Sequence, residues 1–425
     1  MQLNRVSTKP GQGQRGFWWS WGMSEWVTQP LRDLAAFQKG RKVETSDHPQ
    51  EGFAPYLGAS AISGVIEEFG DTRTGVMASP GDVLMLWDGE RSGLVGKAQA
   101  GVISSTVARL SPKNCIDGEF LFYALDAKFE WIQGRRTGTG VPHVPKDLSH
   151  ILSISYPIDK AKQRRIAEIL STLDEAIEQT EALIAKMQQA KAGLMHDLFT
   201  RGVTPDGRLR PTREQAPDLY KESPLGWVPK EWEVKQLEEV ADVNRGKFSI
   251  RPRNDPRYYG GAYPFIQTGD VSLAQGRVLT GYSQTLNDAG LAVSRLFETG
   301  TIMVTIAANI ADTCILGIPM CAPDSLVGVQ PNRGQNIRFL ELCIRRRKAW
   351  FEARAPQTAQ KNINLEDLRP LPVPAPSIRE QEIIAEIYEN IDHSLATSEI
   401  EVGKHRQQKH GLMHDLLTGC VKIVV

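Results

Sequence analysis

A segment of roughly forty residues occurs twice in this chain without a gap. Residues Gln163 to Val203 return as Gln381 to Val421, and the Ile-Ala-Glu-Ile string at Ile166 and the Gly-Leu-Met-His-Asp-Leu string at Gly193 both recur at an offset of 218 residues (384−166 and 411−193). A constant offset over such a length indicates an internal duplication. Any fold proposed for the chain must therefore hold two copies of one long unit.

Each copy has the hydrophobic pattern of a long helix with one seam. Heptads written from Ile166 place mostly apolar residues at the core positions, and no Gly or Pro interrupts the two copies before Gly193 and Gly403. At 1.5 Å per residue such a helix is roughly 60 Å long. Its seam needs a partner, which is either the other copy or the helix's own domain, and we expect the copies to pair. The predicted seam residues are Ile166, Leu170, Leu173, Ile177, Thr180, Ile184, Met187, Lys191, Leu194 and Leu198, followed by Ile384, Tyr388, Ile391, Leu395, Ser398, Val402, His405, Lys409, Leu412 and Leu416.

The segments that precede the two helices are also duplicated, but more loosely. Each contains a Gly-led turn into a predicted buried strand and, later, an aromatic segment that reads as a helix. The loops between these points share little sequence or length, so the loops have diverged while the helices have stayed alike. This contrast is expected if both helices serve one kind of partner and the loops recognise different things. The matched pieces are Trp26 with Trp232, Lys39-Gly40 with Arg245-Gly246, Pro55–Leu57 with Pro264–Ile266, Gly81–Met85 with Gly300–Val304, and Phe120-Leu121 and Trp131 with Phe339-Leu340 and Trp350.

Length and composition narrow the class of protein. A chain of 425 residues predicts two or more domains. Lysine plus arginine equals aspartate plus glutamate at 50 each, so any DNA binding must come from local basic patches or be shared with a more basic partner. The five cysteines show no paired zinc spacing and are too few for a disulfide framework, which favours the cytoplasm. No run approaches the eighteen apolar residues of a membrane span, so we expect no membrane partner.

The predicted order is globular unit, long helix, connection, globular unit, long helix. A leader rich in Gln, Gly and Arg precedes it and is expected to be disordered, and one hypothesis is that Met23, and not Met1, is the native start. The connection carries several prolines among charges, as exposed linkers do. The predicted boundaries are 1–22 for the leader, 23–157 for the first globular unit, 158–203 for the central helix, 204–224 for the linker, 225–372 for the second globular unit and 373–421 for the C-terminal helix.

Three motifs occur together and in a fixed order. Ser-Pro-Leu-Gly-Trp-Val-Pro at Ser223 is followed by Trp-Glu-Val at Trp232, a Pro-rich lead from Leu371 runs into Gln381, and each helix ends in Gly-Leu-Met-x-Asp-Leu. In this combination, from about Met23 to Val421, the chain resembles the specificity subunits of type I restriction-modification systems. The resemblance implies an α/β protein with two pseudo-symmetric α/β target-recognition domains separated by two long antiparallel coiled-coil helices.

The resemblance also implies a function. Such a subunit catalyses nothing, reads an asymmetric bipartite site on double-stranded DNA, and docks two methyltransferase subunits and restriction subunits for adenine methylation or restriction. No cofactor is expected on this chain, because S-adenosylmethionine, ATP and Mg are expected on the partner subunits. Geometry supports this independently, since two readers at the ends of a rigid spacer fix the distance between half-sites. The alternatives are a coiled-coil interaction scaffold without sequence-specific DNA binding and an enzyme with a hidden active site.

Basic and amide-rich loops are the candidate DNA contacts. Pro- and Gly-punctuated basic loops suit phosphate contacts, and amides suit adenine edges, although a solvated charge run and backbone-capping turns are the simpler alternatives. In the first unit the candidates are Lys39, Arg41 and Lys42, and then Arg135, Arg136 and Thr137 in a loop that ends at His143 and lacks the amides of its counterpart. In the second unit they are Arg245, Lys247, Arg251, Arg253, Arg257 and Tyr258, then Gln357, Thr358, Gln360, Lys361 and Asn362.

Other charged motifs are weaker evidence for a functional site. Only part of the basic run from Arg345 to Lys348 can face one phosphate track, and it could equally meet an acidic partner surface. The His-Asp pairs at His196 and His414 do not share a helix face and are not tied to a nucleophile, so we interpret them as helix-end structure or a docking surface. The phosphate-loop-like string at Gly93 lacks its first glycine and its Ser or Thr, and no metal-binding pattern occurs.

Overall fold

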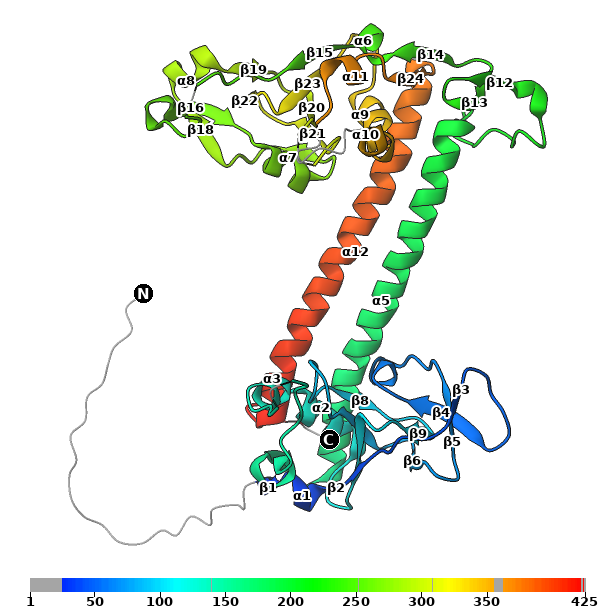
Figure 1. The fold of residues 1–425 in the computed structure, drawn as a ribbon, viewed down its shortest axis with the longest axis vertical. Coiled ribbons are helices and arrows are strands. Elements are labelled where there is room, and N and C mark those ends of the chain that lie inside the picture. The colour runs from blue at the N-terminus through cyan, green and yellow to red at the C-terminus, as the bar shows by residue number, and fades with distance from the viewer. Residues whose placement is uncertain are drawn as a thin grey trace, which may run out of the picture. The chain divides into compact units, whose positions relative to one another are not determined.

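The computed structural model describes residues 25–138, 140–250, 252–307, 309–354, 362–421 and 423. It divides into two compact units, called unit 1 (Met1–Ala182 with Ile400–Val425) and unit 2 (Leu183–Glu399). Two helices contribute to both units, α5 (Lys160–Thr200) and α12 (Ile378–Thr418) (Figure 1). The predicted leader, residues 1–22, lies outside the described residues. None of the helices in the described part of the chain has the length and hydropathy of a membrane span.

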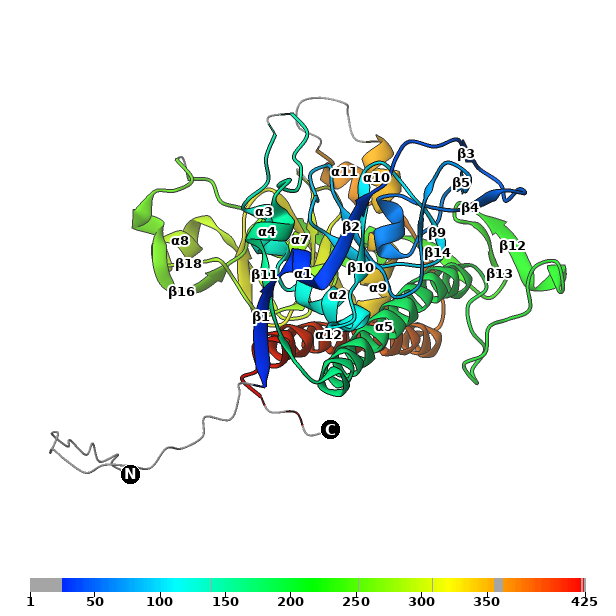
Figure 2. The ribbon, with the colours of Figure 1, turned by 90° about the horizontal axis from the view of Figure 1, so that it is seen from below.

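Unit 1 contains two mainly antiparallel sheets and a strand pair. The sheet orders are β2-β10-β7-β8 and β3-β5-β4-β9-β6, and β1 pairs antiparallel with β11 (Figure 2). The strands are β1 (Trp26–Pro30), β2 (Ala35–Lys39), β3 (Thr45–Ser46), β4 (Phe53–Leu57), β5 (Phe69–Asp71), β6 (Val76–Ala78), β7 (Val83–Leu86), β8 (Val95–Lys97), β9 (Gly101–Ile103), β10 (Val107–Pro112) and β11 (Ser153–Pro157). The helices are α1 (Leu31–Leu34), η1 (Ser60–Ser63), α2 (Gly118–Asp126), α3 (Phe129–Gln133) and α4 (Leu148–Ile151).

Unit 2 repeats this plan with additional elements. Its sheets follow the orders β15-β23-β20-β21-β17 and β18-β16-β22-β19, and two further pairs are β12-β13 and β14-β24. The strands are β12 (Tyr220–Ser223), β13 (Gly226–Pro229), β14 (Glu233–Gln236), β15 (Ala241–Arg245), β16 (Tyr259–Phe265), β17 (Val278–Leu279), β18 (Gln284–Leu286), β19 (Arg295–Phe297), β20 (Ile302–Thr305), β21 (Thr313–Leu316), β22 (Met320–Ala322), β23 (Leu326–Pro331) and β24 (Pro372–Ala375). The helices are η2 (Pro217–Leu219), α6 (Leu237–Val240), η3 (Pro256–Tyr258), α7 (Thr268–Ala274), α8 (Asp288–Val293), α9 (Ile337–Arg345), α10 (Lys348–Arg354) and α11 (Leu365–Leu368).

The pieces matched in the sequence occupy matching places in the two units. The Gly-led turns enter β7 and β20, whose residues are all buried. The strands β4 and β16 each make a parallel pair, through Tyr56 with Val102 in unit 1 and Phe265 with Cys321 in unit 2. The segments around Phe120 and Phe339 are the helices α2 and α9. The prediction of a duplicated α/β plan is therefore confirmed.

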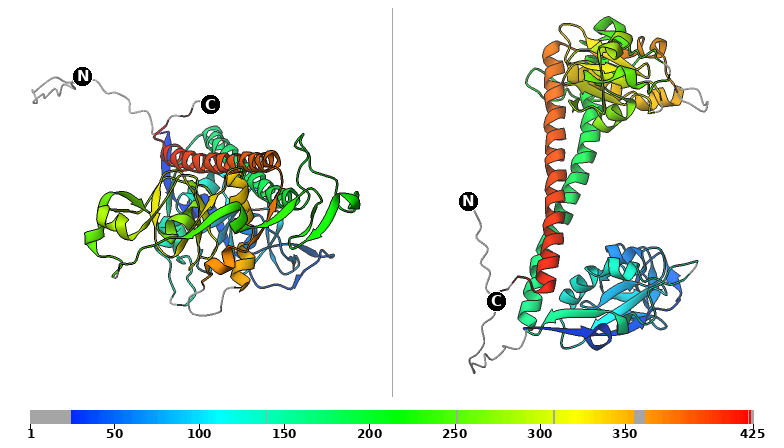
Figure 3. Two further views of the ribbon diagram at one scale, coloured as in Figure 1. Left: turned by 90° about the horizontal axis from the view of Figure 1, so that it is seen from above. Right: turned by 90° about the vertical axis from the view of Figure 1, so that its left-hand side faces the viewer.

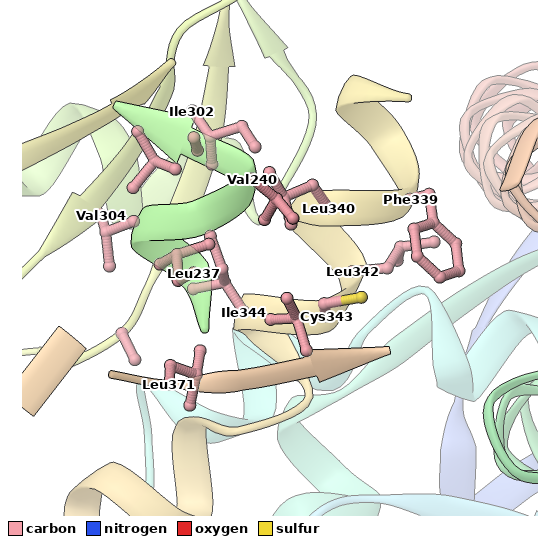
Figure 4. Packing of buried hydrophobic residues seen from close by; sticks show 14 of the residues in the cluster. Leu237, Val240, Ile302, Val304, Phe339, Leu340, Leu342, Cys343, Ile344 and Leu371 are labelled. Atoms are coloured by element: carbon pink, nitrogen blue, oxygen red, sulfur yellow. The ribbon is translucent and has the colours of Figure 1, made fainter. Parts of the chain in front are cut away.

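The core of unit 2 shows why these elements assemble. Leu237 of α6, Ile302 of β20 and Leu340 of α9 are each 0 to 2% exposed and meet in one apolar cluster (Figure 4). Completely burying a side chain of this size contributes about 1.5–3 kcal/mol. Leu31, Val83 and others form the corresponding cluster of unit 1. Each unit thus has its own hydrophobic core, as an independent domain needs.

A glutamine at the start of each long helix fixes that helix to its domain. Gln163 is 0% exposed; it accepts a hydrogen bond from Asp117 N (2.6 Å) and donates to two backbone carbonyls. Gln381, its copy, is 1% exposed; it accepts from Asn336 N (2.9 Å) and donates to Pro376 O (3.0 Å). Asp117 and Asn336 are themselves the N-caps of α2 and α9. The duplication begins at this glutamine because the joint between helix and domain is the same in both units.

The helices α5 and α12 lie side by side and antiparallel within each unit (Figure 3). In unit 1, Lys409 Nζ contacts Asp174 Oδ1 (2.6 Å). In unit 2, Lys191 Nζ contacts Asp392 Oδ1 (2.5 Å), and these two pairs are copies of each other at the 218-residue offset (409−191 and 392−174). Every predicted seam residue is buried or partly buried. The pairing of the two copies is therefore confirmed.

The helices differ in detail from the segments predicted for them. The helix α12 begins at Ile378, later than the 373 start of the predicted segment, because Pro372–Ala375 pair with β14 as the strand β24. The predicted linker is also partly buried, since Arg210 is 7% and Tyr220 4% exposed. Arg210 is drawn inward by the carboxylate of Glu380, to which its guanidinium donates.

Candidate nucleic-acid interface

Lys39 lies at the end of β2 in unit 1, where it meets two loops. Its Nζ donates to Asp88 Oδ2 (2.7 Å), and the other carboxylate oxygen of Asp88 contacts His143 Nδ1 (2.9 Å). Thr137 and His143 exchange two backbone hydrogen bonds, at 3.0 and 2.8 Å, which close the loop between them. The structure thus brings together Lys39 and the loop from Thr137 to His143. The residue that joins them, Asp88, was not predicted, although a carboxylate just after a buried strand could have indicated it.

The two arginines that precede this loop are held by their own unit. The guanidinium carbon of Arg135 lies 3.8 Å from the centroid of the Trp131 ring. The Nε of Arg136 donates to the Gln133 carbonyl (3.0 Å), and its terminal nitrogen donates to the carbonyl of Glu90. Backbone and ring contacts therefore fix the direction of both positively charged side chains.

Arg41 and Lys42 follow β2 and are exposed. They follow Gly40, where a Cβ would lie 2.1 Å from the Ser104 carbonyl oxygen, so only glycine allows the strand to pass this close. The close approach fixes the point at which the chain leaves the sheet. Arg41 and Lys42 therefore carry two positive charges outward from the same end of the sheet as Lys39.

The basic loop of unit 2 is partly neutralised by a distant carboxylate. Arg245 Nε donates to the Asp324 carbonyl (2.6 Å), and the guanidinium of Arg253 pairs with the Asp324 carboxylate. Sequence spacing could not show this, because Asp324 lies 71 positions from Arg253. Arg251, a further predicted contact, lies outside the described residues.

The second half of this loop carries its own ion pair. The side chain of Arg257 donates from Nε to both oxygens of Asp255 (3.1 Å each), and this contact holds the pKa of the carboxyl below its ordinary value. Asp255 also caps η3 by accepting from Arg257 N. Tyr258 is partly exposed, and Lys247 is exposed beside the buried Phe248. Lys247 and the arginines thus surround a short, structured loop.

The amide-rich window of unit 2 is only partly described. Asn362 forms an isolated bridge with Ala307, two residues after β20. The corresponding bridge in unit 1 joins Asp88 and His143, two residues after β7. The two candidate loops therefore end at the same place in the fold, with histidine in one unit and asparagine in the other. The remaining predicted residues of this window, Gln357, Thr358, Gln360 and Lys361, lie outside the described residues.

The basic run from Arg345 to Lys348 makes contacts within unit 2. Arg345 Nε pairs with Glu341 Oε1 (2.9 Å), whose side chain is 0% exposed. The Arg346 guanidinium lies over an aromatic ring of α5 (4.4 Å), and Lys348 pairs with Asp312. These three side chains hold α9 and α10 in place, and their contacts do not require a nucleic acid.

Each unit also has a cavity beside its long helices, between α2, β11 and α12 in unit 1 and between α9, α5 and α12 in unit 2. The cavity of unit 1 is about 390 Å³ and that of unit 2 about 460 Å³. Met413 lines the first and Met195, its copy, lines the second. Their ionisable groups differ: Lys128, His410 and His414 line the cavity in unit 1, and Lys191, Arg277, Arg345, Arg346, Tyr388, Asp392 and Glu399 line it in unit 2.

The His-Asp pairs lie near these cavities and not in a catalytic arrangement. Asp197 pairs with Arg201 Nη1 (2.9 Å), one turn further along the helix, and His414 is exposed on the cavity wall. Among the described residues, no group of three or more His, Cys, Asp and Glu side chains could hold a metal ion. Asp197 thus contacts the end of its helix and His414 lines a cavity, while the interpretation as helix-end structure or a docking surface stays a prediction.

Comparison with known proteins shows to which family this architecture belongs. The model of the type I restriction modification DNA specificity domain matches residues 23–189 and 229–402, once for each copy of the duplicated plan. The chain belongs to this family. Its members are specificity subunits, so the chain is a non-catalytic component with a role in DNA sequence recognition.

Individual relatives agree with this assignment along nearly the whole chain. This specificity subunit is 28% identical over 418 residues to the type I restriction enzyme MjaVIII specificity subunit of Methanocaldococcus jannaschii, covering 94% of this chain and 93% of that protein. It is 22% identical to the EcoDI specificity subunit of Escherichia coli, covering 92% and 87%. The crystal structure of a type I S subunit from M. genitalium has a similar fold, with a TM-score of 0.61 at 17% identity, and covers 94% and 97%.

Proposed function

We propose that this specificity subunit reads an asymmetric, bipartite site on double-stranded DNA and presents that site to two methyltransferase subunits. Each unit binds one half-site through the loops that end at His143 and Asn362. The observation that supports the proposal is the contrast between the units: the helix joints and Lys-Asp pairs are copied, while the candidate loops differ in charge and hydrogen-bonding groups. Different loops on one scaffold predict two different half-sites.

The basic side chains of these loops supply affinity without sequence preference. Contacts to phosphates position a protein on DNA, and contacts to base edges select the sequence. Arg41, Lys42 and Lys247 are exposed, whereas Arg253 and Arg257 carry carboxylate partners. The exposed lysines and Arg41 are therefore the stronger candidates for phosphate contacts in the described part of the chain. The paired arginines would have to exchange their carboxylates for phosphate.

The two cavities are the proposed docking places for the methyltransferase subunits. Both are lined by equivalent positions of the repeated helix, His410 and Met413 in unit 1 and Ala192 and Met195 in unit 2, which suits two copies of one partner. An apolar anchor surrounded by polar groups is the usual centre of such an interface. S-adenosylmethionine, ATP and Mg would be bound by the partner subunits and not by this chain. The complex would act in the cytoplasm, where restriction subunits would join it for cleavage.

A genome-wide map of N6-methyladenine, with and without this gene, tests the proposal. Loss of one split, asymmetric motif, methylated in both halves, is the expected result. Unchanged methylation in cells that express the adjacent methyltransferase would contradict the proposal, and it would favour the interaction scaffold if the two proteins still bind each other.

Docking is tested separately by counting partner subunits in the purified complex. Met195→Asp and Met413→Asp should each reduce the number of bound methyltransferase subunits from two to one, and the double variant should bind none. Substituting Gln189, which is exposed on α5 and does not line the cavity, with Asp is the matched control. Two bound subunits in the double variant would refute this docking place.

A further inference from the structure

His143 has one ring nitrogen, Nδ1, in contact with a carboxylate, while Nε2 has no hydrogen-bond partner among the described residues and lies beside Gly138. The Asp88 carboxylate accepts a hydrogen bond from the Lys39 ammonium and contacts Nδ1 of His143. The Asp88 side chain is 20% exposed, and the Lys39 and His143 side chains are each 45% exposed. An ionised carboxylate can only accept hydrogen bonds, so the Nδ1 atom that faces it carries the proton. A neutral imidazole has one N–H, and therefore Nε2 is left with a free lone pair.

The backbone holds this imidazole in one place. Besides the two bonds between Thr137 and His143, Gly89 N donates to the Pro142 carbonyl (2.9 Å). Gly138 has a φ of +103°, and a Cβ there would lie 3.0 Å from Cδ2 of the His143 ring and 2.6 Å from the Val141 carbonyl oxygen. The loop thus folds closely around the ring, and only glycine allows it. A group held this firmly is preorganised for recognition.

The same place in unit 2 carries a different hydrogen-bonding residue. The bridge between Asp88 and His143 corresponds to the bridge between Ala307 and Asn362. The carboxylate of Asp88 is replaced by the methyl group of Ala307 in unit 2, which cannot make the contacts that Asp88 makes to Lys39 and His143. The position of His143 and Asn362 is fixed in the fold, but its side chain differs between the two units. We therefore expect it to contribute to a difference in sequence specificity.

We propose that His143 reads a base edge in the half-site bound by unit 1, by accepting a hydrogen bond at Nε2 from an exocyclic amino group. In the major groove, the bases that offer such a donor are adenine through N6 and cytosine through N4. Asp88 and Lys39 are positioning residues, because they fix which nitrogen carries the proton. This inference rests on the proposed function, since it requires that unit 1 binds DNA.

The substitution Asp88→Asn tests the tautomer directly. The Lys39 ammonium can only donate hydrogen bonds, so it stays bonded to the oxygen of the new amide. The amide NH₂ then faces Nδ1 of His143 and donates to it. The imidazole proton must move to Nε2, which becomes a donor. The base preferred on the contacted strand should therefore change: cytosine, which has no major-groove acceptor, should be lost, guanine or thymine should be gained, and adenine could be contacted only through N7 and no longer through its N6 amino group. A single mismatched position changes affinity by roughly five- to a hundredfold.

The experiment is a selection from duplex DNA randomised in both half-sites, using the full chain with its methyltransferase partner. Asp88→Asn should change the preference at one position of one half-site and leave the other half-site unaltered. His143→Ala removes the acceptor and should abolish the preference at that same position. Asp82→Asn is the matched control, because Asp82 also accepts a hydrogen bond, from Ser79 N (2.9 Å), and is not bonded to the histidine. It should select the wild-type motif.

The outcomes separate this inference from the function on which it rests. A wild-type complex that selects no split motif would overturn the proposed function. A wild-type motif that persists in both Asp88→Asn and His143→Ala would overturn the reading role of His143 while leaving the function intact. An equal loss of affinity for all sequences, with the motif unaltered, would also overturn it, because a merely structural role predicts that result.

Discussion

Replacing Glu380 with glutamine should destabilise unit 2 by about 3–5 kcal/mol. The Glu380 side chain is 9% exposed and accepts hydrogen bonds from Arg210 Nη2 (3.1 Å), Trp232 Nε1 (3.1 Å) and Val203 N (2.8 Å). This one carboxylate joins the first turn of α12 to the segment that leaves α5. Glutamine keeps the shape and one acceptor oxygen but removes the charge.

The magnitude follows from what the substitution leaves behind. The Arg210 side chain is 9% exposed, and its remaining partner, Glu231, is 78% exposed at 3.0 Å. An exposed partner contributes about 0–1 kcal/mol, whereas removing one member of a buried ion pair leaves an uncompensated charge. The glutamine amide group would also point its N–H donors at a guanidinium that can only donate.

Urea denaturation and hydrogen exchange measure the effect. Far-ultraviolet circular dichroism should show the unit 2 transition at lower urea, and the Val203 amide should exchange about a hundredfold faster or more, at 1.4 kcal/mol for each factor of ten. Lys162→Met is the matched control, because Lys162 occupies the equivalent position of unit 1 (380−162 equals 218) and pairs with Glu25, which is 65% exposed. The control should lose less than about 1 kcal/mol. A comparably small loss in the Glu380 variant would refute the reasoning.

Three further predictions follow from single contacts. Gly246→Ala should destabilise unit 2 by about 2–4 kcal/mol in urea, because the new Cβ would lie 2.1 Å from the Pro323 carbonyl oxygen; Gly281→Ala, with open space around it, should not. Burial raises the pKa of the Asp126 carboxyl. The contribution of this group to stability is therefore present below its ordinary pKa and is lost as the pH rises through the raised pKa. The free energy of unfolding in urea of Asp126→Asn, relative to the wild type, should therefore increase between pH 3 and pH 7. Lys247→Ala should weaken binding to all sequences and reduce the salt slope by about one, and an unaltered slope would exclude its phosphate contact.

The sequence predicted the repeated and periodic parts of the fold. The heptad seam identified which face of each helix is covered, and the Gly-led turns at Gly81 and Gly300 located two central strands. The Pro-rich lead was assigned to the helical segment, although Pro372–Ala375 form a strand. Periodicity reports which residues are buried, but not which residues they meet.

The candidate sites show the same limit. The basic loop of unit 2 was interpreted from local spacing, in which Asp255 is the only visible carboxylate; Asp324 becomes its neighbour only through folding. Asp88 and Glu380 were not recognised for the same reason, since their partners lie far away in the sequence. Charge patterns therefore indicated where a nucleic-acid surface could lie, whereas the structure shows which of its cations already have partners.

The joint made by Gln163 and Gln381 bears on how such a chain can change over generations. On the domain side, Gln163 bonds to the amide of residue 117 and the carbonyls of residues 115 and 157. Gln381 bonds to the amide of residue 336 and the carbonyl of residue 376, and it also donates to the side chain of Gln335 (3.2 Å). Amides and carbonyls of the main chain are common to nearly every amino acid. These bonds therefore depend little on the side chains that a recognition domain brings, although the domain must still pack apolar side chains against the start of the helix, at Ile166 in unit 1 and Ile384 in unit 2. A domain of unrelated sequence that keeps these main-chain positions and this packing could attach to the same helix by recombination, and the subunit would then recognise a different DNA sequence.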